Sequence, residues 1–307
     1  MPFSLPFASL SLGSHQGRAV GPLFLTACVS SMAYKNIHKI PIIMKKLFIP
    51  LCALLILSVA SCNSKGKSMR PDKFDTLRFS YSWSLIDGDT TSPSYEGDIV
   101  FIYLNSQDSL RARTVNDSIM KSAFDITGLT PQAALDSFLK KEHEEFISQR
   151  EDYLKAVEKD EPAASYYRRL LLSAMVEPGR NSEWNYTLSN YRYTGGAHGD
   201  MAFTHFNFDS ISGHNITMDE AFGANYQKPL GEKILQAIYK KEGASSIAQL
   251  NAKGYLIQQG NLPLPQNFFL QKDSVEFMYN HYEIACYAKG IVEVKLSYDE
   301  LKGLLKE

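Results

Sequence analysis

One stretch of this sequence combines residue types and spacing that could place chemistry at a turn. Tyr193, Gly195, Gly196 and His198 lie within six consecutive residues. Two adjacent glycines allow positive φ angles and close approach of the backbone. We therefore predict that Gly195 and Gly196 form a structural turn, without a role in catalysis, which brings His198 to the start of a strand.

Three histidines in the second half of the chain could hold a metal ion, because zinc and other transition metals favour imidazole. His198, His205 and His214 are separated by seven and nine residues, which matches no compact metal motif. His143 begins a His-Glu-Glu run, but a zincin helix needs a second histidine where this chain has Ile147. We expect no metal site and no cofactor.

Nucleophilic catalysis has little support in the sequence. The chain contains no Gly-x-Ser-x-Gly elbow. Cys286 follows His281 by five residues and could act as a nucleophile beside it, but a buried structural cysteine is the favoured interpretation of its apolar surroundings. Carboxylates are scattered and cannot be paired as acid and base without geometry. We expect no catalytic residue.

Tyrosines are numerous in the second half of the chain. Tyrosine supplies a large, rigid contact area with a hydrogen-bonding tip, which suits interfaces with proteins and saccharides. The alternative is that most of these rings line the core of a sheet. We expect a ligand-binding face formed by Tyr193, His198, Tyr282 and Tyr287.

The first 61 residues are typical of a lipoprotein leader. Met44 starts a basic, then apolar, then small-residue pattern that ends at Cys62, and the segment before Met44 contains no acidic residue. Translation is therefore expected to start at Met44. The apolar run over residues 47–60 is shorter than the roughly 20 residues that a membrane span needs. We expect Cys62 to be lipidated and residues 62–72 to form a tether.

Loss of residues 1–61 and lipidation of Cys62 leave Cys286 as the free thiol, which excludes a disulfide framework. The formal net charge is −1 and basic residues are scattered, so we expect no nucleic-acid partner. Membrane contact is expected through the lipid alone. The predicted location is the cell envelope, as a membrane-anchored lipoprotein that faces the periplasm, with the outer membrane as the expected site.

The remaining chain predicts an α+β fold with a mainly antiparallel sheet, a long helix in the first half and packed helices in the second. Apolar patterning predicts strands at residues 74–86, 99–104, 166–177, 184–192, 202–209, 267–271, 274–279 and 291–296. Helical spacing predicts helices at residues 131–159, 228–242 and 247–252. A Ser-x-x-Glu capping box at Ser297 predicts a closing helix, and the segment between residue 104 and Pro131 is expected to be turn-rich.

Several of these segments resemble a known family. They are the Tyr-x-Gly-Gly-Ala-His motif at Tyr193, the Ser-Gly turn after Asp209, the Met-Asp-Glu-Ala-Phe segment ending at Phe222, and residues 267–290. Together they are similar to the extracytoplasmic domain shared by the lysozyme-sensing anti-sigma factor RsiV and the non-catalytic N-terminal region of PdaC-type peptidoglycan deacetylases. Residues 161–307 would form the family-like subdomain, and residues 73–160 a first α+β subdomain.

The resemblance implies a non-catalytic, lipid-anchored module that binds or senses a ligand in the envelope. A lysozyme-type muramidase and peptidoglycan are the implied partners. Two alternatives stay open: a cell-wall hydrolase or deacetylase, or an accessory domain to one, and a structural envelope lipoprotein.

Asp-Ser/Thr-apolar tripeptides recur in the chain and resemble the O-glycan acceptor motif of some bacterial lineages. Asp-Ser and Asp-Thr are also common at turns, because their side chains bond to nearby backbone groups. Ser109 and Ser274 are the favoured acceptors, since both are expected at strand ends.

Overall fold

The computed structural model describes residues 72–161, 163–258 and 262–306 of the chain. The predicted start at Met44, the lipidation site Cys62 and nearly all of the tether lie outside these residues. Within the described part of the chain, none of the helices has both the length and the apolar character that a membrane span requires.

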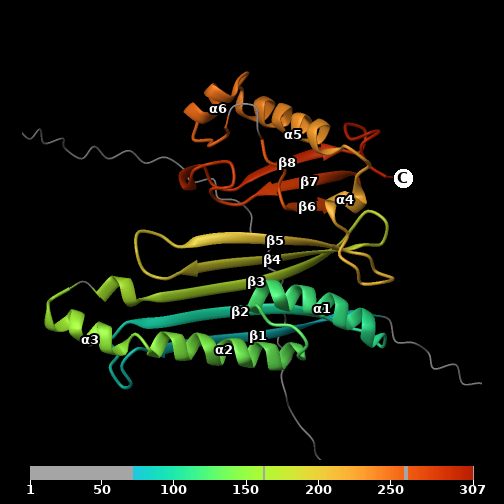
Figure 1. Ribbon diagram of the computed structural model, residues 1–307. Coiled ribbons are helices and arrows are strands. Elements are labelled where there is room, and N and C mark those ends of the chain that lie inside the picture. The colour runs from blue at the N-terminus through green and yellow to red at the C-terminus, as the bar shows by residue number, and fades with distance from the viewer. Residues whose placement is uncertain (1–71, 162, 259–261, 307) are drawn as a thin grey trace, which may run out of the picture. The chain divides into compact units, whose positions relative to one another are not determined.

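Five strands form the first sheet, in the order β1 (Lys73–Ser84), β2 (Ser94–Asn105), β3 (Arg168–Pro178), β4 (Trp184–Tyr193) and β5 (Asp200–Phe208) (Figure 1). Neighbouring strands are antiparallel except β2 and β3, which are parallel, so this sheet is mixed. A parallel pair requires a long crossover, and the helices between β2 and β3 supply it. The predicted α+β fold is confirmed.

The crossover contains α1 (Ser109–Phe124), α2 (Pro131–Ile147), α3 (Arg150–Glu158) and a short 3-10 turn, Ala163–Tyr166. Figure 1 shows α1 and α2 lying across one face of the sheet. The long helical segment predicted from Pro131 is present, but it is interrupted at Ser148 and Gln149, which separate α2 from α3.

The prediction of a turn-rich segment before Pro131 is wrong, because α1 occupies most of it. Asp108 caps this helix by accepting hydrogen bonds from the backbone N–H groups of Leu110 and Arg111. An apolar stripe that includes Val115 and Ile119 then faces the core. Ser, Thr, Asn and Asp are frequent in α1, and their preference for caps and turns obscured the stripe.

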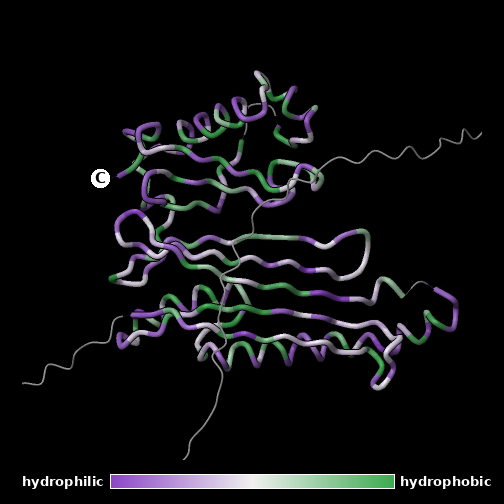
Figure 2. The backbone as a smooth tube through the Cα atoms, turned by 180° about the vertical axis from the view of Figure 1, so that it is seen from behind, coloured by the Kyte–Doolittle hydropathy of each residue, from purple (hydrophilic) through white to green (hydrophobic). Residues whose placement is uncertain are grey.

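The first hydrophobic core lies between this sheet and the helices. Phe101, Phe146, Tyr186 and Phe208 are each at most 1% exposed, and fully burying a side chain of this size stabilises the fold by roughly 1.5–3 kcal/mol. Figure 2 shows hydrophobic and hydrophilic residues alternating along the helices, as expected when one face packs on a sheet.

A second sheet consists of β6 (Asn267–Leu270), β7 (Ser274–Tyr279) and β8 (Val292–Ser297), all antiparallel. The helices of this half are α4 (Met218–Ala221), α5 (Gln227–Glu242) and α6 (Ile247–Ala252), and a second 3-10 turn covers Tyr287–Lys289. Apolar residues of α5 and the inner residues of β7 and β8 form a second hydrophobic core.

The predicted closing helix is not formed. Ser297 and Glu300 make the reciprocal bonds of a capping box, but residues 298–304 form turns. Gly303 takes a positive φ of 81°, and Leu305 forms a bridge with Phe222. The chain is therefore diverted toward α4 after a single capped turn.

Asparagine side chains join the two sheets. Asn207 of β5 donates to Phe268 O at 2.9 Å and accepts from Leu270 N at 2.8 Å, both on β6. Asn267 of β6 does the converse, donating to Phe203 O and accepting from His205 N, both at 3.0 Å. The amides thus satisfy backbone groups at the two sheet edges, where no ladder joins β5 to β6.

The two hydrophobic cores draw on successive parts of the chain, since the buried residues of the first end at Phe208 and those of the second begin at Phe222. The expected division after residue 160 falls between α3 and β3, within the segment that forms the first sheet. The division into two subdomains at this point stays a prediction.

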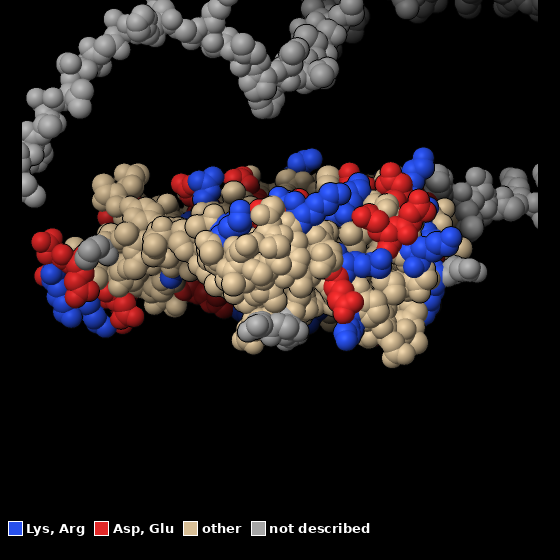
Figure 3. Space-filling model, turned by 90° about the horizontal axis from the view of Figure 1, so that it is seen from above, with Lys and Arg blue, Asp and Glu red and all other residues tan. Residues whose placement is uncertain are grey.

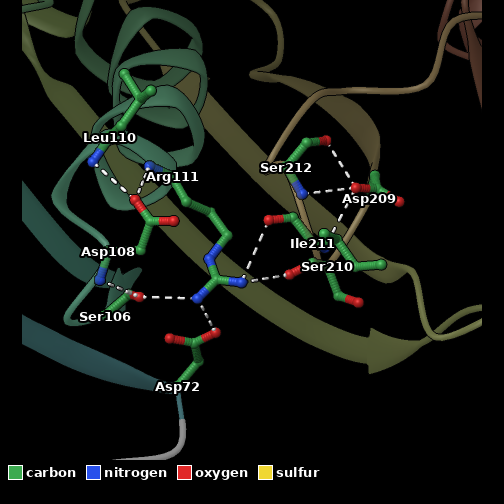
Figure 4. Close-up of polar contacts among 9 residues, drawn as sticks. All are labelled: Asp72, Ser106, Asp108, Leu110, Arg111, Asp209, Ser210, Ile211 and Ser212. Carbon is green, nitrogen blue, oxygen red and sulfur yellow. Dashed lines mark hydrogen bonds and ion pairs between the residues drawn. The ribbon is translucent and has the colours of Figure 1, made fainter. Parts of the chain in front are cut away.

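Arg111 fastens the beginning of the described chain to the loop after β5 (Figure 4). Its Nη2 lies 2.7 Å from Asp72 Oδ2, and its Nη1 donates to Ser210 O at 2.9 Å. Asp72, the first described residue, therefore contacts the folded body beside Ser210. Of the two favoured glycan acceptors, Ser109 is exposed beside this cluster, whereas Ser274 is only 3% exposed in β7.

Candidate functional site: an aromatic platform

The loop over residues 194–199 joins β4 to β5 and contains both predicted turn glycines. Gly195 and Gly196 have φ angles of 88° and 98°, in the region that L-residues rarely adopt. A Cβ atom at Gly195 would lie 2.5 Å from Ser165 O, whereas one at Gly196 would meet open space. Gly195 therefore allows both the turn and a close backbone contact.

Three aromatic rings stack where this loop meets the segment after β7. The ring centroids of His198 and Tyr287 are 3.8 Å apart with an interplanar angle of 18°. His281 stacks on the same tyrosine at 4.6 Å and 29°. Tyr282 lies beside them, with its ring centroid 6.1 Å from that of Tyr287. We call His198, His281, Tyr282 and Tyr287 the aromatic platform.

Backbone carbonyl groups hold the rings of the platform in place. Tyr287 Oη donates to Gly199 O at 2.9 Å. His198 Nδ1 lies 2.9 Å from Gly199 O, and His281 Nδ1 lies 3.0 Å from Met201 O. Because a carbonyl only accepts, both Nδ1 atoms carry the proton. In a neutral imidazole Nε2 is then an acceptor, able to take a hydrogen bond from a hydroxyl group.

Tyr282 is the platform residue whose backbone is strained. Its φ is 66°, and its side chain is 56% exposed. A left-handed conformation costs a residue other than glycine of order 1 kcal/mol or more. Its N–H donates to Ala285 O at 3.0 Å, which closes the tight turn that sets this conformation. The turn thus holds the Tyr282 ring at the surface, clear of the second hydrophobic core.

The structure brings together three of the four predicted binding residues, His198, Tyr282 and Tyr287. The fourth, Tyr193, instead supports the turn, since its Oη donates to Gly196 O at 3.0 Å. His281 was considered in the sequence only as a partner for Cys286. Its position directly before Tyr282 was the signal that could have placed it on the platform.

The other histidines have separate partners. His205 lies with Nε2 3.2 Å from Met278 Sδ, and burial lowers its pKa to about 4. His214 pairs with Glu220 at 2.8 Å. Within the residues that the structure describes, no group of three or more His, Cys, Asp or Glu side chains is arranged to hold a metal ion.

Cys286 is half-buried, and its backbone N–H donates to Gly254 O at 2.8 Å. A Cβ atom at Gly254 would lie 3.1 Å from Cys286 Sγ, so the thiol packs closely against that glycine. His281, its suggested partner, has its ring stacked on Tyr287. This arrangement favours the structural interpretation of the cysteine.

An open groove of about 950 Å³ lies between α5 and β8, and none of the platform residues lines it. Its walls carry both signs of charge, including Lys240, Lys241, Glu293 and Lys295. Figure 3 looks onto the side of α5 and α6 and shows basic and acidic groups interspersed. Mixed charges in an open groove select no particular ligand. We therefore place the candidate site at the platform, where ordered rings converge.

Comparison with known proteins confirms the resemblance expected from the sequence. Residues 215–299 match the family model "Protein of unknown function (DUF3298)". The chain is 28% identical over 124 residues to the peptidoglycan-N-acetylmuramic acid deacetylase PdaC of Bacillus subtilis strain 168. That alignment covers 39% of this chain and 25% of PdaC, so the chain spans about a quarter of that relative.

Two solved structures share the fold. A DUF3298 family member from Bacteroides fragilis NCTC 9343 matches with a TM-score of 0.71 and 24% identity, over 77% of this chain and 94% of that one. A DUF3298 family protein from Pseudomonas aeruginosa PAO1 matches with a TM-score of 0.50 and 19% identity, over 76% and 95% of the two chains. Tyr282 and Tyr287 lie inside the segment matched by the family model, and His198 lies before it.

Proposed function

We propose that this protein is a non-catalytic, lipid-anchored binding module of the cell envelope, and that its aromatic platform holds the glycan of peptidoglycan. The observation that carries this proposal is the set of stacked rings around Tyr287, with Tyr282 strained and exposed beside them. The faces of sugar rings carry C–H groups of partial positive charge, which complement the negative face of an aromatic ring.

The polar atoms of the platform suit the same ligand. Nε2 of His198 is left free to bond to sugar hydroxyls because Nδ1 already bonds to Gly199 O, and Tyr282 offers a phenolic hydroxyl that can donate or accept. The DUF3298 segment and the distant similarity to PdaC, whose name states an action on peptidoglycan, favour the wall polymer as ligand.

The position of the tether supports a role in binding at a distance from the membrane. Asp72 is fastened beside Ser210, which follows β5, whereas His198 precedes β5. The two points thus lie at opposite ends of a nine-residue strand, which is about 30 Å long. A lipid at Cys62 would anchor the chain from this first end, and a tether of ten residues, which spans at most about 36 Å when extended, would leave the platform free to reach the wall.

The test is co-sedimentation of the full-length protein, purified in detergent, with insoluble peptidoglycan, alongside a pull-down with purified lysozyme. Sedimentation with peptidoglycan and intact muropeptides is the expected result. Recovery of lysozyme at a stoichiometric ratio without sedimentation would favour a sensor of muramidases. Turnover of muropeptides would favour the hydrolase or deacetylase alternative. If none of these three results is obtained, the structural lipoprotein alternative is favoured.

The anchor is tested separately in the native host. Mass spectrometry of the membrane fraction should detect no peptides from residues 1–61, and Cys62→Ser should release the protein from the membrane. Retention of the Cys62→Ser variant would contradict the lipoprotein proposal, but it would leave the platform proposal untouched.

A further inference from the structure

A small pocket of about 220 Å³ lies directly beside the loop that carries His198. Its lining comes from β2, α2, β3, β4 and the loop itself. The residues that matter for its chemistry are Tyr95, Glu142, Gln149, Arg168, Arg192 and Thr194.

The acidic groups of this pocket already have partners. Glu142 is 9% exposed, and its two carboxylate oxygens lie 3.1 and 3.0 Å from Arg192 Nη1. Tyr95 Oη donates to the same carboxylate. Glu145, at the rim, lies 3.8 Å from Lys141 on the exposed face of α2. The charges of Glu142 and Arg192 therefore offset each other.

Arg168 differs because its guanidinium is held by neutral acceptors. Nη2 donates to Gln149 Oε1 at 2.6 Å, and Nη1 donates to Thr194 O and to Ser165 O. Among the described residues, Nε has no acceptor. Nε and Nη2 form the edge of the guanidinium that can grip a carboxylate in a bidentate pair.

Partial burial of the Arg168 guanidinium also favours the binding of an anion beside it. Loss of water around the guanidinium lowers the pKa of Arg168, and the nearby phenols of Tyr95 and Tyr193 only partly offset this effect. A half-buried charge is better stabilised by an opposite charge than by neutral carbonyls, because charge-assisted hydrogen bonds are the stronger ones.

We propose that the Arg168 pocket binds a carboxylate of the ligand held by the aromatic platform, and that in peptidoglycan this group is the lactyl carboxylate of an N-acetylmuramic acid residue that carries no stem peptide. This inference rests on the proposed function. A pocket of about 220 Å³ admits a carboxylate on a short stem but not a chain of sugar rings. The neutral glycan of N-acetylglucosamine alone lacks such a group.

The pocket and the platform are close enough for one ligand. Thr194 lines the pocket and bonds to Arg168, and His198 follows four residues later on the platform. Four extended residues span at most about 14 Å. A glycan segment of a few rings that lies along the platform can therefore place a carboxylate at Arg168.

The test compares two tetrasaccharides of equal length by calorimetry on the full-length protein in detergent. One alternates N-acetylglucosamine with N-acetylmuramic acid and carries no peptide, and the other is N-acetylglucosamine throughout. The protein should bind the first about tenfold or more tightly, since a bond between charged groups is worth at least that factor. Arg168→Gln should abolish this preference, so that the variant binds the two tetrasaccharides equally. Arg169→Gln, on the neighbouring exposed residue, is the matched control and should keep the preference.

A second ligand tests the same point without a variant. Reducing the lactyl carboxylates to alcohols should lower the affinity of the wild-type protein to that of the neutral tetrasaccharide. Equal affinities for the two original sugars, or a preference that survives in Arg168→Gln, would overturn the inference and leave the proposed function standing. Failure of the wild-type protein to bind either sugar would overturn the proposed function, and the inference with it.

Discussion

The imidazole of His198 and the phenol of Tyr287 lie face to face, 3.8 Å apart, although 88 residues of chain separate the Gly199 carbonyl from the Tyr287 hydroxyl that bonds to it. This contact fastens the β4–β5 loop to the segment after β7. The platform is therefore a joint between the two sheets as well as an exposed surface.

Tyr287→Phe should separate these two roles. The variant keeps the ring but loses the hydrogen bond to Gly199 O, which typically contributes about 1 kcal/mol. We expect faster amide hydrogen exchange over residues 194–199, with binding of peptidoglycan largely retained. Exchange that matches the wild-type protein would show that the hydroxyl does not hold the loop.

The two turn glycines should differ in their response to alanine. Gly196→Ala should cost about 1–2 kcal/mol, because a positive φ disfavours any Cβ. Gly195→Ala should cost more and lower the melting temperature further, because its Cβ would also meet the backbone of Ser165. Thermal unfolding followed by circular dichroism compares them. Unchanged melting curves for both variants would refute the turn interpretation.

His205 should make the protein less stable in mild acid. Its folded pKa of about 4 lies below the ordinary value of 6.5, because burial disfavours the charged ring. Above pH 6.5 it contributes nothing to the pH dependence. Between pH 6.5 and 4 the unfolded chain takes up the proton and the folded chain does not, so stability falls by up to about 3 kcal/mol.

Denaturant unfolding at pH 7 and pH 4.5 measures this loss, and His205→Gln should reduce it. An NMR titration of the His205 ring supplies an independent reading. A midpoint near 6.5 in the folded protein would contradict the assignment.

Asn207 should matter for stability far more than an exposed asparagine. Asn207→Leu leaves Phe268 O and Leu270 N without partners at a position only 1% exposed, and each stranded group costs about 1–3 kcal/mol. We expect a loss of about 2–6 kcal/mol in the free energy of unfolding, measured in urea. Asn181→Leu, at an exposed site in the β3–β4 turn, is the control. A loss below 1 kcal/mol would show that the junction is not held by this amide.

Trp83 and Trp184 both pack against the first hydrophobic core, so tryptophan fluorescence follows that half of the molecule. If Asn207 couples the two cores, unfolding of Asn207→Leu should differ between fluorescence and far-ultraviolet circular dichroism. Coincident curves would instead mean that other contacts carry the coupling.

Local patterning in the sequence predicted most strands and helices, because each needs only one apolar face. The strand that includes Phe206 and Phe208 and the helix predicted at residues 228–242 are examples. The helix α1 was not predicted, because its polar residues favour turns when they are considered alone. Val115 and Ile119 stabilise this helix only through their packing on the sheet. Tertiary context here overrides local preference.

The platform was predictable in residue type but not in geometry. His198, Tyr282 and Tyr287 were chosen as polar aromatic residues, and nothing in their spacing indicated that they would stack. The reciprocal amides of Asn207 and Asn267 depend on which strand edges meet, which a local pattern does not encode. The Arg168 pocket likewise forms from four elements that are distant in sequence.

The central claim is that the platform binds peptidoglycan, and Tyr282→Ala tests it most directly. The side chain is exposed and contributes little to the core, so the variant should fold normally. Removing one ring from a stacking surface should weaken binding to peptidoglycan about tenfold in a sedimentation isotherm, which corresponds to about 1.4 kcal/mol. Phe79→Ala, at another exposed aromatic residue on β1, should bind like the wild-type protein. Equal affinity of Tyr282→Ala and the wild-type protein for peptidoglycan would contradict the account.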